Sequence, residues 1–314
     1  MLGDKAMTTL LGIVLGVLLL ATIVGKILAA RATTEKSKRL IANLNARTRA
    51  WWIMVLIFSV SICLGGLTTV VLFGLSSFLA FREFVTLTPT RRGDHRALFW
   101  AFFAIIPIQY VLIGIQWYGL FAIFIPVYAF LFIPIRVALG GDPVNFLGRT
   151  SRVQWGLMVC VYFVSHVPAL LMLDIPGYSG RNASLLFFFI LIVQMNDVFQ
   201  YLWGNLFGRR AIAPVISPNK TWEGFIGGLI SSTAVGAALY WTTPFLAWQS
   251  AALAFAIAGM GFAGDLTMSA VKRDLGVKDY SNMIPGHGGV LDRLDSLSFA
   301  APFFFHLTRY FFTP

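Results

Sequence analysis

The sequence predicts an all-α, polytopic integral membrane protein with nine to ten transmembrane helices. Of its 314 residues, 58% are hydrophobic and only 12% are charged, whereas soluble domains carry about 25% charged residues. The mean hydropathy is +0.78. The apolar residues also fall into separate runs, most of them close to the roughly 20 residues that a membrane-spanning helix needs. Composition and run length together exclude an ordinary soluble domain.

The apolar runs follow one another along the whole chain. They cover approximately residues 8–30, 51–81, 98–115, 120–137, 153–173, 184–203, 225–240, 247–268 and 294–312. The second run is too long for one ordinary span. Because Gly65 and Gly66 lie in its middle, we expect two shorter helices there, which gives ten elements. A single kinked unit would give nine.

Basic residues concentrate in the segments between particular runs. These segments are residues 31–50, 85–95, 138–152, 204–221 and 270–293, whereas residues 116–119 and 241–246 carry no charge. By the positive-inside rule the basic segments, read here as loops, face the cytoplasm. All the basic segments fall on one side of the membrane only if the second apolar run forms two helices. With that arrangement, we expect both termini on the outer side. We expect an integral protein of a bacterial inner membrane, with the basic segments on its cytoplasmic side.

The net charge of +11 suits anionic lipid headgroups and does not indicate nucleic acid, because it falls mostly between apolar runs. Cys63 and Cys160 lie inside apolar runs and are expected to be small core residues. The two polar concentrations of the chain lie in its second part. We therefore expect residues 1–180 to form a lipid-facing scaffold and residues 181–314 to carry the functional site.

The first polar concentration runs from Ser269 to Asp295, between the last two apolar runs. Pro285 and the glycines around it interrupt any helix, so the middle is expected to be a loop. Cationic side chains and Gly-rich turns hold phosphate, and carboxylates hold Mg²⁺. The charged side chains of this stretch are Lys272, Arg273, Asp274, Lys278, Asp279, Asp292, Arg293 and Asp295.

The spacing of these residues brings several of them together. Asp265, Ser269 and Lys272 are spaced i, i+4, i+7, so they share one face of a helix. Asp292 and Asp295 share a face if the last run is helical from Leu291 onward. A carboxylate in a membrane helix is costly and marks a functional site by default. For Asp274 and Asp279, a solvated juxtamembrane loop is an equal alternative.

The second polar concentration covers residues 196–228. Asn196 and Asp197 stand inside an apolar run, where a charge needs a reason. Residues 217–221 predict a turn that leads into a helix, capped by Thr221 or Asn219. The start of that helix, beside Lys220, is a suitable anion site.

These residues carry a resemblance to a known family. The order S-x-V-K-R, four residues, then K-D-x-S-x-x-I-P-x-H-G-G-V-x-D-R-L-D, between Ser269 and Asp295, resembles the signature of the CDP-diacylglycerol synthases (phosphatidate cytidylyltransferases). Residues 217–228 resemble the S-P-x-K-T-x-E-G-x-x-G-G element of that family, and residues 196–209 resemble its N-D-x-x-A-Y-x-x-G-x-x-F-G-R run. Gln200 departs from this last pattern, which has a small residue there. The resemblance covers residues 197–295.

The resemblance implies an enzyme that condenses CTP with phosphatidic acid, giving CDP-diacylglycerol and pyrophosphate at the cytoplasmic membrane face. It implies Mg²⁺, with a second, monovalent cation as an option, and a homodimer. The metal ligands are expected to be Asp265 and Asp292, supported by Asp295 and Asp197. Expected substrate contacts are Ser217, Lys220, Ser269, Lys272, Arg273, Lys278, His287, Gly288 and Gly289, with Arg293 stabilising the leaving pyrophosphate.

Other functions stay open from the sequence. A CTP-dependent lipid kinase, such as a polyprenol kinase, also combines a polytopic membrane body with CTP, but it transfers the γ-phosphate. A transporter of anionic solutes is the alternative from a different class. It would have polar residues at the membrane midplane and related halves, whereas here the polar residues gather near one rim and no internal repeat is visible.

Overall fold

The computed structural model describes residues 5–31, 34–284 and 288–314. Eight helical segments of this part of the chain are long and apolar enough to cross a membrane. They are α1 (Lys5–Arg31), α2 (Glu35–Leu64), α3 (Gly66–Leu87), residues 92–114, residues 118–138, residues 146–172, α10 (Asn182–Phe207) and α12 (Ala247–Asp274). Two more helices, α11 (Trp222–Ala238) and α13 (Leu291–Phe312), cover the two other predicted apolar runs.

The second apolar run forms two helices, as predicted, because α2 ends at Leu64 and α3 begins at Gly66. The prediction that residues 31–50 form a loop is wrong, however. The α2 helix begins at Glu35, where the Thr34 side chain accepts a hydrogen bond from Ser37 N and caps the helix. The segment from Glu35 to Ala50 contains no Gly or Pro and is rich in good helix formers. Its charges set its position relative to the membrane but do not prevent a helix.

Three spans are helical but irregular. The segment 92–114 consists of η1 (Arg92–Asp94), α4 (His95–Trp100), a π-helical turn η2 (Ala101–Ile105) and α5 (Ile106–Gly114). The next combines α6 (Tyr118–Ile123), η3 (Phe124–Ala129) and α7 (Phe130–Ala138). The third combines α8 (Phe146–Leu157), η4 (Met158–Phe163), α9 (Val164–Ala169) and η5 (Leu170–Met172). Such π turns are often found near functional sites.

The core of the bundle lies around α13, which packs against α12, α9, α10 and α3. Its largest fully buried side chains include Phe81, Phe121, Phe188, Phe189, Phe304 and Phe305. The outer helix α1 instead exposes a row of large apolar side chains, including Leu19 and Leu20, which suits a face in contact with lipid. The last helix of the chain is therefore central, and helices from both halves of the chain surround it.

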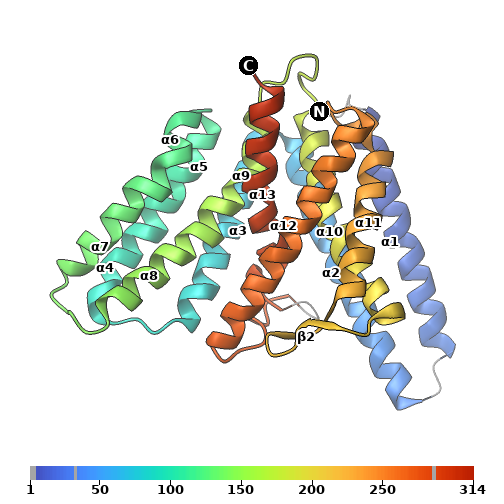
Figure 1. The fold of residues 1–314 in the computed structure, drawn as a ribbon, viewed down its shortest axis with the longest axis horizontal. Helices are drawn as coiled ribbons and strands as arrows, with labels where there is room; N and C mark the ends of the chain where they lie inside the picture. Colours follow the sequence, from blue (N-terminus) through green and yellow to red (C-terminus); the bar gives the residue numbers. More distant parts are fainter. Residues whose placement is uncertain (1–4, 32–33, 285–287) are drawn as a thin grey trace.

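One end of the bundle gathers the basic segments of the chain. Figure 1 shows strand β2, the connections between α3 and α4, between α7 and α8 and between α12 and α13, and the start of α2 at this end. The start of α1 and the end of α13 lie at the opposite end (Figure 1). The basic segments thus share one end, which agrees with the arrangement that the positive-inside rule predicts.

Candidate active site

A short β-hairpin precedes α11 at the basic end of the bundle. Strand β1 (Ala211–Ala213) pairs antiparallel with β2 (Ser217–Thr221), with Ala211 opposite Thr221 and Ala213 opposite Ser217. The prediction of a turn at residues 217–221 is therefore wrong, because pairing with β1 extends this segment. Pairing with β1 therefore holds Lys220 in a defined position, because a paired strand restrains its side chains more than an open turn does.

The strand passes directly into α11. Thr221 caps the helix by accepting a hydrogen bond from Gly224 N at 3.2 Å, which confirms one of the two predicted caps. Glu223, in the first turn, accepts hydrogen bonds from the backbone N–H groups of Arg209 and Arg210 at 3.0 and 3.3 Å. The N–H of Arg209 holds the pKa of the Glu223 carboxyl below its usual range. The end of α10 and the start of α11 are thus tied together beside the hairpin.

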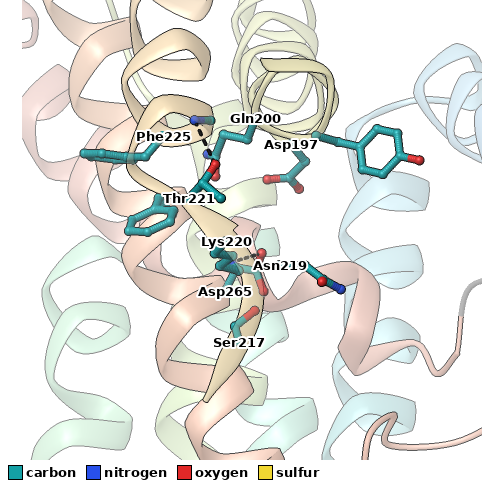
Figure 2. A pocket seen from close by; sticks show the side chains of 11 residues that line it. Asp197, Gln200, Ser217, Asn219, Lys220, Thr221, Phe225 and Asp265 are labelled. Carbon is teal, nitrogen blue, oxygen red and sulfur yellow. Dashed lines mark hydrogen bonds and ion pairs between the residues drawn. The ribbon is translucent and has the colours of Figure 1, made fainter. Parts of the chain in front are cut away.

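A pocket of about 240 Å³ opens between α10, β2, α11 and α12. Asp197 and Gln200 of α10, Lys220 of β2 and Asp265 of α12 are among its lining residues. Figure 2 shows the Asp197 carboxylate directed into the same space as the Lys220–Asp265 pair. Within the described residues, Gln200 Nε2 is buried without a hydrogen-bond partner. A buried, unsatisfied donor in a pocket is typical of a place for a polar ligand or water.

The pocket contains the first lysine–carboxylate pair of the site. Lys220 Nζ forms an ion pair with Asp265 Oδ2 and lies 5.1 Å from the ring centroid of Phe262. Ser269 Oγ donates to Asp265 Oδ1 at 3.3 Å. The predicted shared face of Asp265 and Ser269 on one helix is therefore present, with Lys220 brought to it from a separate element.

A second lysine–carboxylate pair lies where α12 meets the start of α13. Lys272 Nζ donates to Asp292 Oδ1 at 2.8 Å and lies 3.8 Å from Asp295 Oδ2. All three residues are buried. The helix α13 begins at Leu291, so Asp292 and Asp295 share a face, as predicted. Burial without water makes the attraction between these charges strong, and it makes the loss of either partner costly.

Ser296 of α13 links α10 to this second pair. Its hydroxyl donates to the Asp197 carboxylate at 3.1 and 3.3 Å, and its backbone N–H donates to Asp295 at 2.8 Å. Carboxylates from α10, α12 and α13 therefore lie around one region of the bundle. In the part of the chain that the structure describes, no group of three or more acidic, His or Cys side chains is already arranged to hold a metal ion.

Asp292 also organises the loop between α12 and α13. Its Oδ2 atom accepts hydrogen bonds from Tyr280 N at 2.8 Å and Gly289 N at 2.9 Å, and burial raises the pKa of the Tyr280 phenol. Gly288 has a φ of +80°, and a Cβ there would lie 2.8 Å from Asp292 Oδ2. Gly288 and Gly289 thereby let the loop close onto Asp292, and their contact with the triphosphate stays a prediction.

Glu83, near the end of α3, is not among the residues that the sequence predicts. It is 5% exposed and accepts hydrogen bonds from Ser281 Oγ, Val290 N and Leu291 N at 2.7, 3.0 and 2.9 Å. It thus lies against the loop from the first half of the chain. In the sequence, the carboxylate of Glu83 stands at the end of an apolar run, which could have pointed to it. An ordinary charge beside the membrane gives the same pattern, so this position alone does not indicate a role in the site.

The remaining predicted residues occupy different places. Arg273 donates to the carbonyl oxygens of Ile216 and Val277 at 3.2 and 3.0 Å, so it ties the hairpin to the end of α12. Arg293 has a buried Nε without a hydrogen-bond partner among the described residues, which suits an anion. Lys278 is exposed on the loop, and Ser217 lines the pocket. His287 lies outside the described residues.

Comparison with known proteins identifies the family of the chain. The model of the cytidylyltransferase family matches residues 45–311. An uncharacterized protein of Escherichia coli K12, YnbB, is 40% identical over 311 residues, which is 98% of each chain. A phosphatidate cytidylyltransferase of Mycobacterium leprae is 40% identical over 166 residues, 52% of this chain and 51% of the relative.

A phosphatidate cytidylyltransferase of Staphylococcus aureus strain COL is 42% identical over 129 residues, 40% of this chain and 50% of the relative. The match therefore spans about half the length of each of these two enzymes. The family match is much longer, because it extends from the middle of α2 almost to the end of α13. The chain belongs to the cytidylyltransferase family, whose members are nucleotidyltransferases.

Proposed function

We propose that the protein is a phosphatidate cytidylyltransferase, which converts CTP and phosphatidic acid to CDP-diacylglycerol and pyrophosphate. The observation that carries the proposal is the meeting of Lys220, Asp265, Lys272 and Asp292 at the basic end of a membrane bundle. The family membership supports nucleotidyl transfer, and the names of two relatives support phosphatidate as the lipid.

The pocket beside Lys220 is the proposed site for the nucleotide phosphates. Ser217, Asn219 and Thr221 offer polar groups along the same strand, and the start of α11 adds the positive end of a helix dipole. When a triphosphate enters, Lys220 would exchange Asp265 for a phosphate oxygen. Gln200 Nε2, which lacks a partner within the described residues, would donate to the same ligand.

The reaction needs an oxygen of the lipid phosphate to attack the α-phosphorus of CTP in line. The P–O bond to the β-phosphate breaks as the new P–O bond forms, and pyrophosphate leaves. Catalysis of this kind consists mostly of positioning and charge stabilisation. Arg293 lies in the first turn of α13 and Lys272 reaches it from α12. Both would face the negative charge that moves from the attacking to the leaving oxygens.

The donor atoms of the site fit a hard divalent cation such as Mg²⁺, because they are carboxylate oxygens. Asp197, Asp265 and Asp295 are the proposed ligands, since Asp292 already accepts from Lys272, Tyr280 N and Gly289 N. That Asp292 is also a metal ligand stays a prediction from the sequence. A bound Mg²⁺ would neutralise the attacking and leaving oxygens. A monovalent second cation and a homodimer stay predictions from the resemblance.

The protein is an integral membrane protein, and we propose that its site faces the cytoplasm of a bacterial cell. The support is the position of the basic segments at the same end as the pocket (Figure 1), combined with the positive-inside rule. The acyl chains of the lipid would then stay in the bilayer while its phosphate reaches the rim of the bundle.

The test uses the purified protein in detergent with phosphatidic acid, Mg²⁺ and CTP labelled at the α-phosphate. Label that enters the lipid phase with release of pyrophosphate, and that is lost in Asp265→Asn, supports the proposal. Lipid label that arises only from γ-labelled CTP would identify a lipid kinase instead. Absence of lipid label from either nucleotide would contradict phosphatidate as the substrate.

A further inference from the structure

The hydrogen bonds of Glu83 connect the first half of the chain to the loop between α12 and α13. The donors are one hydroxyl, from Ser281, and two backbone N–H groups, from Val290 and Leu291. Ser281 precedes the tip of the loop and the other two follow it, at the start of α13. One buried carboxylate therefore holds both limbs of the loop.

The position of Glu83 suits a negative charge. The N–H groups of Val290 and Leu291 lie at the start of α13, where a helix leaves its first donors without internal partners. The partial positive charge at this end stabilises an anion. A buried carboxylate is costly unless its oxygens are satisfied, and here both oxygens accept hydrogen bonds. An apolar side chain would fill this volume at lower cost but would leave the three donors unsatisfied.

Gly289 allows the close contact between the loop and α3. A Cβ at this residue would lie 2.8 Å from Glu83 Cδ and closer still to one of its oxygens, so any side chain would push the loop away from Glu83. On its other side, the N–H of Gly289 donates to Asp292. The backbone of this residue is therefore held between two carboxylates, one from each half of the chain.

Asp292 and Glu83 hold different residues of the loop between α12 and α13. Asp292 holds Tyr280 N and Gly289 N, and Glu83 holds the residues next to these two. The start of α13 also carries Arg293 and Asp295, and Lys272 reaches it from α12. If the loop moved, the distances among these charges would change, and a displacement of about 1 Å can cost roughly a hundredfold in rate.

We propose that Glu83 is a positioning residue for the reaction. It anchors Ser281, Val290 and Leu291 and thereby sets the place of Asp292 and Arg293 relative to Lys272. The effect on turnover rests on the proposed function, whereas the anchoring of the loop does not. The three hydrogen bonds of Glu83 go to Ser281, Val290 and Leu291, so in this proposal it acts through these residues.

The test compares Glu83→Gln with the wild-type protein in detergent. Glutamine keeps the size but replaces one acceptor oxygen by an NH₂ group, which would face the N–H of Val290 or of Leu291 instead of accepting from it. Hydrogen exchange read by mass spectrometry should show a rise of roughly ten- to a hundredfold for the segment that contains Val290 and Leu291, as for the loss of a hydrogen bond to a charged group. Segments of α10 and α11 should keep wild-type exchange.

Kinetics provide the second readout. If the loop is displaced, kcat should fall by roughly ten- to a hundredfold. The KM for CTP should stay within about threefold, because the pocket beside Lys220 is not changed by the substitution. Loop opening in Glu83→Gln supports the anchoring even if wild-type protein does not label phosphatidate, so the failure of the substrate proposal can be recognised separately.

Three further variants sharpen the result. Glu35→Gln makes the same chemical change on the exposed start of α2, where Glu35 pairs with Lys38, and should match the wild type. Ser281→Ala removes one of the three donors and should give a smaller rise in exchange. Gly289→Ala leaves Glu83 in place but blocks the contact, so it should reproduce the loop opening of Glu83→Gln.

Each contrary outcome overturns the proposal in a different way. Wild-type exchange and wild-type turnover in Glu83→Gln would show that the anchor is not needed. Lost turnover with unchanged loop exchange would indicate direct contact with substrate. Faster exchange in α10 and α11 as well as in the loop would indicate general destabilisation. A closed loop in Gly289→Ala would show that the Glu83 contact does not hold it.

Discussion

The two lysine–carboxylate pairs of the site have different surroundings. Lys220 and Asp265 line a pocket, with 16% and 29% of their side chains exposed. Lys272 and Asp292 are 11% and 2% exposed, and two backbone N–H groups also donate to Asp292. A pair at the edge of a pocket can exchange one partner for a ligand, whereas a closed pair resists this because its charges would be left buried. We therefore predict that the first pair exchanges a partner for substrate, whereas Asp292 of the second pair fixes the loop.

Substitution of the closed pair should have the largest effect. In Asp292→Asn, Lys272 loses its nearest charge partner, and the NH₂ group replaces either the oxygen that accepts from Lys272 or the oxygen that accepts from both Tyr280 N and Gly289 N. We expect the free energy of unfolding to fall by about 3–5 kcal/mol and turnover to fall by roughly a thousandfold. Thermal denaturation followed by tryptophan fluorescence, together with the labelling assay, measures both. Asp274→Asn, at the exposed end of α12, is the matched control. If Asp292→Asn unfolds at the same temperature as the wild-type protein, the distinction between the two pairs is refuted.

Substitution of the open pair should separate activity from stability. Asp265→Asn keeps the shape of the side chain but removes the charge that faces the pocket. Turnover is expected to fall by about a hundred- to a thousandfold, while the free energy of unfolding changes by less than about 1 kcal/mol, as for a partly exposed ion pair. A loss of stability as large as that of Asp292→Asn would mean that both pairs are architectural.

Lys220→Ala should affect the use of CTP more than the chemical step. The lysine is the cation of the pocket in the described residues, so its removal should raise the KM for CTP by about tenfold, with a smaller fall in kcat. Initial rates over a range of CTP concentrations measure this split, and Lys220→Arg serves as the charge-preserving comparison. An unchanged CTP dependence would remove Lys220 from the nucleotide site.

The smallest effect is expected at the turn that closes onto Asp292. Gly288→Ala forces a residue with a Cβ into a positive φ, which costs roughly 1–2 kcal/mol. Turnover should fall by about tenfold, since the loop can relax partly. The same substitution at Gly141, which also has a positive φ but lies between α7 and α8 with nothing within 4 Å of an added Cβ, should cost only the backbone strain and should not lower kcat. Equal loss of kcat in both variants would contradict a role for the loop.

The sequence predicted best what lies within one helix. The shared face of Asp265 and Ser269, and that of Asp292 and Asp295, follow from helical spacing, and the structure contains both. It could not predict contacts that depend on packing. Glu83 and Ser281 are 198 residues apart, and nothing local marks their meeting. Charged residues do not exclude a helix, so the prediction of a loop after α1 is wrong. The strand at Ser217–Thr221 forms only because β1 pairs with it.

The contact between Gly289 and Glu83 also restricts which amino-acid substitutions the chain can accept at these two positions. Since a side chain at 289 would overlap the carboxylate at 83, neither position can vary without regard to the other. The first half of the protein is then not an interchangeable membrane anchor. A chimera that joins residues 181–314 to the first half of a relative should work only if that half supplies an acidic side chain at the place of Glu83. The two halves are expected to have been inherited as one unit.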